Sequence, residues 1–159
     1  MRTLLFPFFG LLLFISCSKE RQTLNQIEGT FETVEFVVTA SDTDSILFTA
    51  SPTLHFGECA PRDTRCLMTV VDSDSTIYTY RFEYNYDPVS GIEQISFNPG
   101  DSQTAGIDSR LGEAIDNVFD FELDNDELRL YSEDRRWRWP QDSLSRFDLC
   151  DISITAVKR

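Results

Sequence analysis

Apolar and polar side chains alternate with a period of two along much of the chain. In the clearest run, residues 75–87, an aromatic side chain occupies every second position: Tyr78, Tyr80, Phe82, Tyr84 and Tyr86. Polar side chains such as Thr79, Arg81 and Glu83 take the positions between them. Successive side chains of a β-strand point to opposite faces of its sheet. The run therefore predicts a long strand with one buried, aromatic face.

The same period recurs in shorter runs, which are Val34, Phe36 and Val38; Leu54 and Phe56; Phe119, Phe121 and Leu123; Leu128 and Leu130; Trp137 and Trp139; and Ile152, Ile154 and Ala156. Between these runs lie "SDTDS", "DSDS", "DPVSG" and "DNDE", which are rich in residues that favour turns. Eight or nine short strands joined by such turns predict an all-β fold, an antiparallel barrel or sandwich.

Helix is expected in only two places. Residues 109–117 predict one or two turns, with Leu111 and Ile115 stacked on one side. A second short helix is expected around Leu24 and Ile27, where it would plug the fold or lead into the first strand.

The chain begins with an apolar run, residues 4–15, that Pro7 and Gly10 interrupt. A membrane-spanning helix needs about 20 apolar residues, so the run is too short to span a bilayer. Arg2 in front of it and the length of the apolar part are typical of a signal peptide. A plain secretory signal with an incidental cysteine stays open as an interpretation.

The end of this run, "FISC", resembles the bacterial lipobox, in which the cysteine is lipidated and becomes the first residue of the mature protein. The resemblance implies a signal peptide over residues 1–16, lipid attachment at Cys17, and a lipidated N-terminus and tether over residues 17–26. Two or more acyl chains hold a protein stably on a bilayer, which would then be its partner. Ser18 after the cysteine favours the outer membrane, whereas the periplasmic or surface orientation stays open.

Residues 27–159 are about the size of one domain with a single core. Their opening, "IEGTFETVEFVV", resembles lipocalin-like domains, with Gly29 and Phe31 in place of a Gly-x-Trp motif. "FELDNDELRLYSE", residues 121–133, resembles the late hairpin of lipocalin-like lipoproteins of Bacteroidetes. The resemblance implies an up-and-down β-barrel of eight or nine strands, with a mouth that binds a small apolar or amphipathic molecule.

The charge of the chain is strongly negative. Removal of residues 1–16 leaves 13 basic against 27 acidic side chains, a formal charge of −14. Nucleic acid and anionic head groups repel such a body, so a nucleic acid partner is not expected. The sequence does not set the oligomeric state.

Three cysteines remain once Cys17 carries lipid. Cys59 and Cys66 flank the polar loop "APRDTR", which favours a local disulfide in an oxidising compartment. Two free thiols, or a bridge from Cys150 to one of them, stay open. Cys150 alternates with Ile152 and Ile154, which predicts that it faces the core.

No set of residues predicts catalysis, a metal or a cofactor. The single histidine, His55, stands between Leu54 and Phe56 on an expected strand. The Asp-x-Asp turns lack the glycine and the distal glutamate of an EF-hand loop. We therefore expect a non-enzyme.

The candidate ligand-binding residues are Tyr78, Tyr80, Tyr84, Trp137 and Trp139. Buried tyrosine hydroxyls need hydrogen-bond partners, so an inward tyrosine row suits a cavity that holds solvent or a partly polar ligand. The tryptophans belong either to the barrel core or to its mouth. The alternative function is a scaffold or adhesion lipoprotein with a packed barrel core, which contacts another envelope protein.

Overall fold

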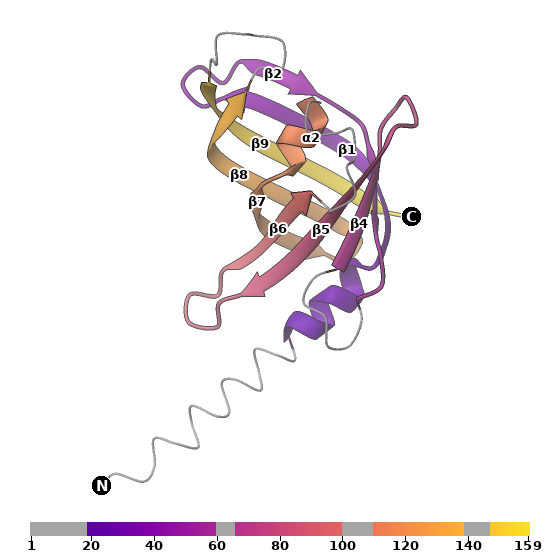
Figure 1. Ribbon diagram of the computed structural model, residues 1–159. Helices are drawn as coiled ribbons and strands as arrows, with labels where there is room; N and C mark the ends of the chain where they lie inside the picture. Colours follow the sequence, from indigo (N-terminus) through magenta and orange to yellow (C-terminus); the bar gives the residue numbers. More distant parts are fainter. Residues whose placement is uncertain (1–18, 60–65, 100–109, 139–146) are drawn as a thin grey trace, which may run out of the picture.

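The computed structural model describes residues 19–59, 66–99, 110–138 and 147–159. In this part of the chain, antiparallel strands wrap around a single core (Figure 1). The strands are β1 (Gly29–Ala40), β2 (Ile46–Thr49), β3 (Thr53–Phe56), β4 (Cys66–Val71), β5 (Ile77–Tyr86), β6 (Glu93–Pro99), β7 (Val118–Asp124), β8 (Glu127–Arg138) and β9 (Phe147–Lys158). The helices are α2 (Arg110–Ile115) and an N-terminal helix described over residues 19–27.

The sheet closes on itself. Each strand from β3 to β9 pairs with the next, and β1 pairs with both β3 and β9. These eight strands form a closed barrel, and β2 is an additional strand, so the expected antiparallel β-barrel is confirmed. β2 continues the line of β3 along β1, where Val37 lies opposite Thr49 and Glu32 opposite Thr53. Pro52 stands at the break between the two strands, where a residue without an N–H group cannot donate to a neighbouring strand.

Phenylalanine rings fill the centre of the barrel. The centroid of the Phe56 ring lies 5.6 Å from Phe31, 5.2 Å from Phe82 and 6.2 Å from Phe97. The chain of rings continues from Phe97 to Phe119 at 5.7 Å. Most of these rings meet edge-to-face or tilted, as aromatic pairs in protein cores prefer. All five side chains are buried, which makes this cluster the core of the protein.

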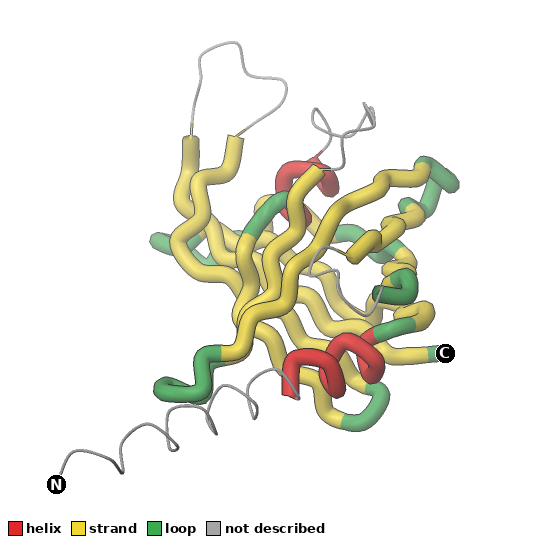
Figure 2. The backbone as a smooth tube through the Cα atoms, turned by 60° about the horizontal axis from the view of Figure 1, so that its bottom comes forward, coloured by secondary structure: helices red, strands yellow, loops and turns green. Residues whose placement is uncertain are grey.

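Helices contribute to the barrel at both ends. The N-terminal helix lies across one end, beside the β5–β6 turn (Figure 2). Its Thr23 and Ile27 are buried, so the described part of the segment expected as a tether lies against the barrel. α2 buries Leu111 and Ile115 near the other end. Both short helices expected from the sequence are therefore present.

One side chain of the expected core face is on the outside. Val34 was expected on the same face as Phe36 and Val38, but its side chain is 70% exposed. The register of β1 against β9 shifts between Thr33 and Glu35. A β-bulge of this kind inserts one extra residue and reverses which alternate positions face inward. The prediction for Val34 is therefore wrong, whereas Phe36 and Val38 are buried as expected.

Candidate ligand-binding groove

The tyrosine row of β5 faces the barrel interior, as the alternation predicts. Tyr78, Tyr80 and Tyr84 are buried, as is Phe82 in the same row, and the alternate side chains Thr79, Arg81 and Glu83 are partly exposed. The Tyr80 hydroxyl lies 3.4 Å from the backbone oxygen of Gly112 in α2, to which it donates a hydrogen bond. Burial, together with the negative charge of Asp116, raises the pKa of this hydroxyl well above its usual range. Tyr80 is therefore neutral and tied to α2.

The other predicted site residues lie apart from this row. Trp137 belongs to β8 and pairs with Asp148 of β9, but its side chain is not among those described. Trp139 and Cys17 lie outside the described residues. A groove on the outer face of β6 to β9 and two smaller hollows beside the N-terminal helix, all lined by described residues, do not include Tyr78, Tyr80 or Tyr84. The role of these tyrosines and of the two tryptophans in ligand binding stays a prediction.

The expected disulfide is present. Cys59 and Cys66 are bonded, with their Cα atoms 5.1 Å apart. Cys66 begins β4 and pairs with Phe82 of β5, so the bond ties the residues that follow β3 to the wall of the barrel. Cys150 is buried and lies outside the disulfide, in agreement with its expected position in the core.

The barrel wall is incomplete between β6 and β7. Only residues 94–96 of β6 pair with residues 118–120 of β7, although β7 continues to Asp124. Beyond this short ladder, Phe121 and Leu123 of β7 line hollows together with residues of the N-terminal helix or the β5–β6 hairpin. The buried ring of Phe121 packs against Tyr84, with the ring centroids 5.2 Å apart. The hollows at this opening therefore lie over buried core side chains.

A groove with a volume of about 850 Å³ follows this opening onto the outer face of β6 to β9. We call it the lateral groove. It is lined by Gly91, Ile92, Glu93, Gln94, Asp120, Phe121, Glu122, Arg129, Leu130, Tyr131, Ser153 and Thr155. A smaller hollow of about 300 Å³ beside the N-terminal helix shares Glu93, Phe121 and Glu122 with it. The two are therefore contiguous.

Strand register arranges the polar lining of the lateral groove in two rows. Gln94, Asp120, Tyr131 and Ser153 lie opposite one another across β6, β7, β8 and β9. Glu122, Arg129 and Thr155 form the next row across β7, β8 and β9. Directly opposite side chains in a sheet lie about 5 Å apart, so each row presents a continuous set of hydrogen-bonding groups.

Glu93 organises the end of the groove near the helix. One carboxylate oxygen accepts a hydrogen bond from Tyr84 at 2.5 Å, and the other lies 2.5 Å from the Lys19 ammonium nitrogen. Burial, followed by the hydrogen bond to Glu93, raises the pKa of Tyr84 above its usual range. The predicted residue Tyr84 is thus connected to the groove through Glu93. Nothing in the alternation of β5 points to this arrangement.

The polar rows of the groove are held by contacts among themselves. Gln94 donates to Asp120 at 3.0 Å, and Arg129 lies 2.6 Å from Glu127 and 3.8 Å from Glu122. Partial burial of the ring, together with nearby Asp151 and Glu133, raises the pKa of Tyr131. The lining residues include three carboxylates, Glu93, Asp120 and Glu122, and one cation, Arg129. The lining therefore favours a ligand whose polar end is neutral or positive.

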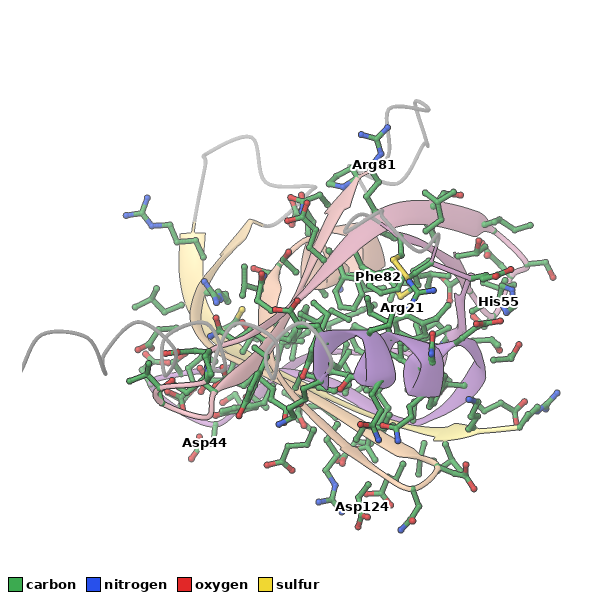
Figure 3. All side chains as sticks on the ribbon, turned by 90° about the horizontal axis from the view of Figure 1, so that it is seen from below. Arg21, Asp44, His55, Arg81, Phe82 and Asp124 are labelled. Atoms are coloured by element: carbon green, nitrogen blue, oxygen red, sulfur yellow. A yellow bond between two sulfur atoms is a disulfide. The ribbon has the colours of Figure 1, made fainter. Side chains whose placement is uncertain are left out.

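The lateral groove has the size and the mixed lining of a small-molecule site. Its exposed apolar surface comes from Ile92, which is 52% exposed, and from the ring of Tyr131, whereas Phe121 and Leu130 are buried beneath it. Small-molecule sites of about 300 to 1,000 Å³ combine apolar surface with a few polar groups that orient the ligand. His55 lies outside the groove, on the outer side of β3, 3.0 Å from the Thr30 hydroxyl (Figure 3). In residues 19–59, 66–99, 110–138 and 147–159, no three His, Cys, Asp or Glu side chains are placed to share a metal ion.

The sequence pattern does not single out the groove residues. Alternation places Asp120 and Arg129 between inward-facing residues, but it does not show where two neighbouring strands separate. The short β6–β7 ladder follows from pairing between strands, and a period of two along one strand carries no signal of it.

Comparison with known proteins yields no relative. No protein-family model matches the chain, and no curated protein or solved structure matches it. None of the helices in the described part of the chain has the length and apolar character needed to cross a bilayer. The resemblance to lipocalin-like lipoproteins therefore stays a prediction from the sequence motifs.

Proposed function

We propose that this protein is an acyl-anchored envelope protein that binds a small amphipathic molecule in the lateral groove, without catalysing a reaction. The observation that carries the proposal is the groove itself. The groove, with a volume of about 850 Å³, combines the exposed apolar surface of Ile92 and the Tyr131 ring with two rows of hydrogen-bonding side chains. Such a combination suits a ligand with an apolar body and a polar end.

The location of the groove differs from the location expected for a lipocalin-like barrel. The centre of the barrel holds interlocking phenylalanine rings, and the Tyr80 and Tyr84 hydroxyls have partners within the protein. These hydroxyls need no ligand to satisfy them. The interior tyrosines therefore give less support to a ligand than the open groove beside them.

The anchor is proposed from the lipobox-like "FISC" and the preceding apolar run. Lipidation at Cys17 would hold the protein on the cell envelope, and Ser18 favours the outer membrane. Replacement of Cys17 by serine is expected to move the protein from the membrane fraction to the soluble fraction. A Cys17→Ser protein that stays with membranes after a carbonate wash would contradict the anchor.

Native mass spectrometry of the full-length protein, purified from its own envelope, tests the binding function. Ile92→Ser removes an apolar side chain from the groove, and Ile77→Ser is a matched control because Ile77 is 57% exposed and lies outside the groove. We expect a retained small-molecule mass in the wild type and in Ile77→Ser, with severalfold lower occupancy in Ile92→Ser. A bare mass in all three proteins, or equal occupancy in both variants, would contradict ligand binding in the groove.

A second candidate function is a scaffold that contacts another envelope protein. The packing of Phe31, Phe56, Phe82, Phe97 and Phe119 favours it, because a solid core leaves the surface as the place of action. The same mass measurement separates the two functions. A bare barrel that retains a second protein chain would support the scaffold.

A further inference from the structure

The β5–β6 turn carries the most exposed large apolar side chain of the described residues. Val89 is 92% exposed and Ile92 is 52% exposed, and Pro88 between Asp87 and Val89 is exposed as well. Exposed apolar side chains grouped at the tip of a hairpin are unfavourable in water and mark a contact surface. The turn therefore has an apolar tip, Pro88, Val89 and Ile92, with no covering element among the described residues.

The apolar tip and the N-terminal helix are joined at the same end of the barrel (Figures 1 and 2). The Lys19 ammonium nitrogen lies 2.5 Å from Glu93 and 3.9 Å from the centre of the Tyr86 ring. Tyr86 and Glu93 pair with each other as the last residues of the hairpin before its turn. The start of the described helix is thus held at the base of the turn.

The expected attachment point of the lipid is only two residues before Lys19. An extended chain covers at most about 3.6 Å per residue, so no more than about 7 Å of chain separates the attachment point from Lys19. The length of chain between the lipid and the barrel is therefore too short to hold the tip far from the bilayer. Acyl chains attached at Cys17 would enter the membrane beside the β5–β6 turn.

The acidic groups flanking the tip are engaged within the protein. Asp87 accepts hydrogen bonds from the Val89 backbone nitrogen at 2.9 Å and from the Ser90 hydroxyl at 2.6 Å. Glu93 is bonded to Lys19 and Tyr84. These contacts satisfy part of the hydrogen-bonding capacity of both carboxylates within the protein. The protein as a whole is nevertheless strongly acidic.

We propose that the β5–β6 turn is a second membrane contact, which places Val89 in the interfacial region of the bilayer next to the acyl anchor. This inference rests on the proposed anchor at Cys17. A buried apolar side chain adds to the membrane affinity of acyl chains and fixes the orientation of the body on the surface. The lateral groove then opens close to the bilayer, because Ile92 belongs both to the tip and to the groove.

Spin labels on the full-length, acylated protein in phosphatidylcholine vesicles test the contact. Val89→Cys carries the label at the tip, and Ile46→Cys is the control at the opposite end, where Ile46 is 67% exposed. Both variants also carry Cys150→Ala, which removes the buried thiol outside the disulfide. We expect the label at position 89 to meet oxygen more often than a water-soluble nickel chelate, and the label at position 46 to show the reverse.

The mass of the N-terminal peptide, measured on the same samples, separates the contact from the anchor. An acylated Cys17 with a label at position 89 that meets the nickel chelate as freely as position 46 would overturn the membrane contact and leave the anchor intact. A Cys17 without acyl chains would overturn the anchor and, with it, this inference. A label at position 89 that is immobilised but not shielded from the chelate would point to a protein partner and would also overturn the contact.

Discussion

Phe56 and Phe97 each contact three other phenylalanine rings of the described aromatic cluster. Truncation of a fully buried phenylalanine leaves a cavity and lowers stability by about 3 to 5 kcal/mol. We expect this loss for Phe56→Ala in chemical denaturation. Phe48→Ala is the control, because Phe48 is only half-buried and touches the edge of the core. An equal loss in the two variants would show that the rings around Phe56 do not pack as described.

The hydrogen bonds of Asp87 make the stability of the β5–β6 turn depend on pH. Its hydrogen bonds, first from Ser90 and then from the Val89 backbone, lower its pKa below the ordinary value of 3.8. Since the folded turn binds the proton less readily than the unfolded chain, the stabilisation is present above pH 3.8. It is lost as the pH falls through the lowered pKa.

Ser90→Ala should therefore raise the pKa of Asp87 toward 3.8. A titration of side-chain carboxyl shifts by NMR measures this directly. Thr76→Val is the control, because it acts on the lowered pKa of Asp74 in the β4–β5 turn and should leave Asp87 unchanged. An Asp87 pKa that is the same with and without Ser90 would contradict the turn geometry.

At the scale of elements, β1 begins at a position whose backbone conformation only glycine adopts readily. Gly29 has a φ of 129°, and a Cβ atom there would lie 2.9 Å from Cε of Lys158. The Lys158 ammonium group donates to the backbone oxygen of Gln26 at 2.9 Å, at the end of the N-terminal helix. Gly29 thus allows the last strand to hold the helix against the barrel.

Gly29→Ala should lower the free energy of unfolding by more than Gly91→Ala does. Both positions have positive φ, but a Cβ at Gly91 would meet nothing within 4 Å. Strain of this kind typically amounts to about 1 to 3 kcal/mol, and displacement of Lys158 adds to it only at Gly29. Denaturation of the two variants measures the difference. A larger loss at Gly91 would contradict the role of Gly29 in seating the helix.

The disulfide is a second feature that holds neighbouring elements together. Cys59 and Cys66 are separated by 7 positions, and closing so short a loop stabilises by roughly 2 to 3 kcal/mol in the chain-entropy account. Mild reduction should lower the midpoint of thermal unfolding of the wild type. The double variant Cys59→Ser/Cys66→Ser should already be at the lower midpoint and should not respond. A wild-type midpoint that reduction leaves unchanged would contradict this contribution.

Alternation along the chain predicts most of these elements but not the contacts that shape the site. The long strand with the inward tyrosines, the turns rich in Asp and Ser, and the helix with Leu111 and Ile115 are all present. The exposure of Val34 and the short β6–β7 ladder are not visible in the pattern. Both are set by pairing with a neighbouring strand. A bulge, or a ladder that ends early, gives no signal in the local alternation of side chains.

The position of Tyr84 illustrates the same limit at the site. The pattern of β5 correctly turns its ring inward, but its hydroxyl meets Glu93, a residue of the next strand that also contacts the helix through Lys19. Three segments of the chain meet there, and no local pattern connects them. The groove at that junction is therefore a finding of the structure.

At the scale of the whole molecule, the apolar residues of the barrel fall into an inward-facing set and an outward-facing set. The phenylalanines stabilise the interior, and a smaller set that includes Ile92 and Val89 faces outward near one end. The acidic balance of the chain keeps such a body apart from anionic surfaces. A cationic amphiphile should therefore enter the lateral groove more readily than an anionic one of the same chain length.

Methyl NMR of the isoleucine side chains tests most directly whether the ligand binds in the groove. The probe is dodecyltrimethylammonium below its micelle concentration, with dodecyl sulfate as the control. We expect the Ile92 methyl signal to shift with the cationic probe, while those of the exposed Ile77 and of the fully buried Ile95 stay in place. Shifts at Ile95 and at the buried Ile154, with Ile92 unchanged, would place the ligand inside the barrel and contradict the lateral groove as the binding site.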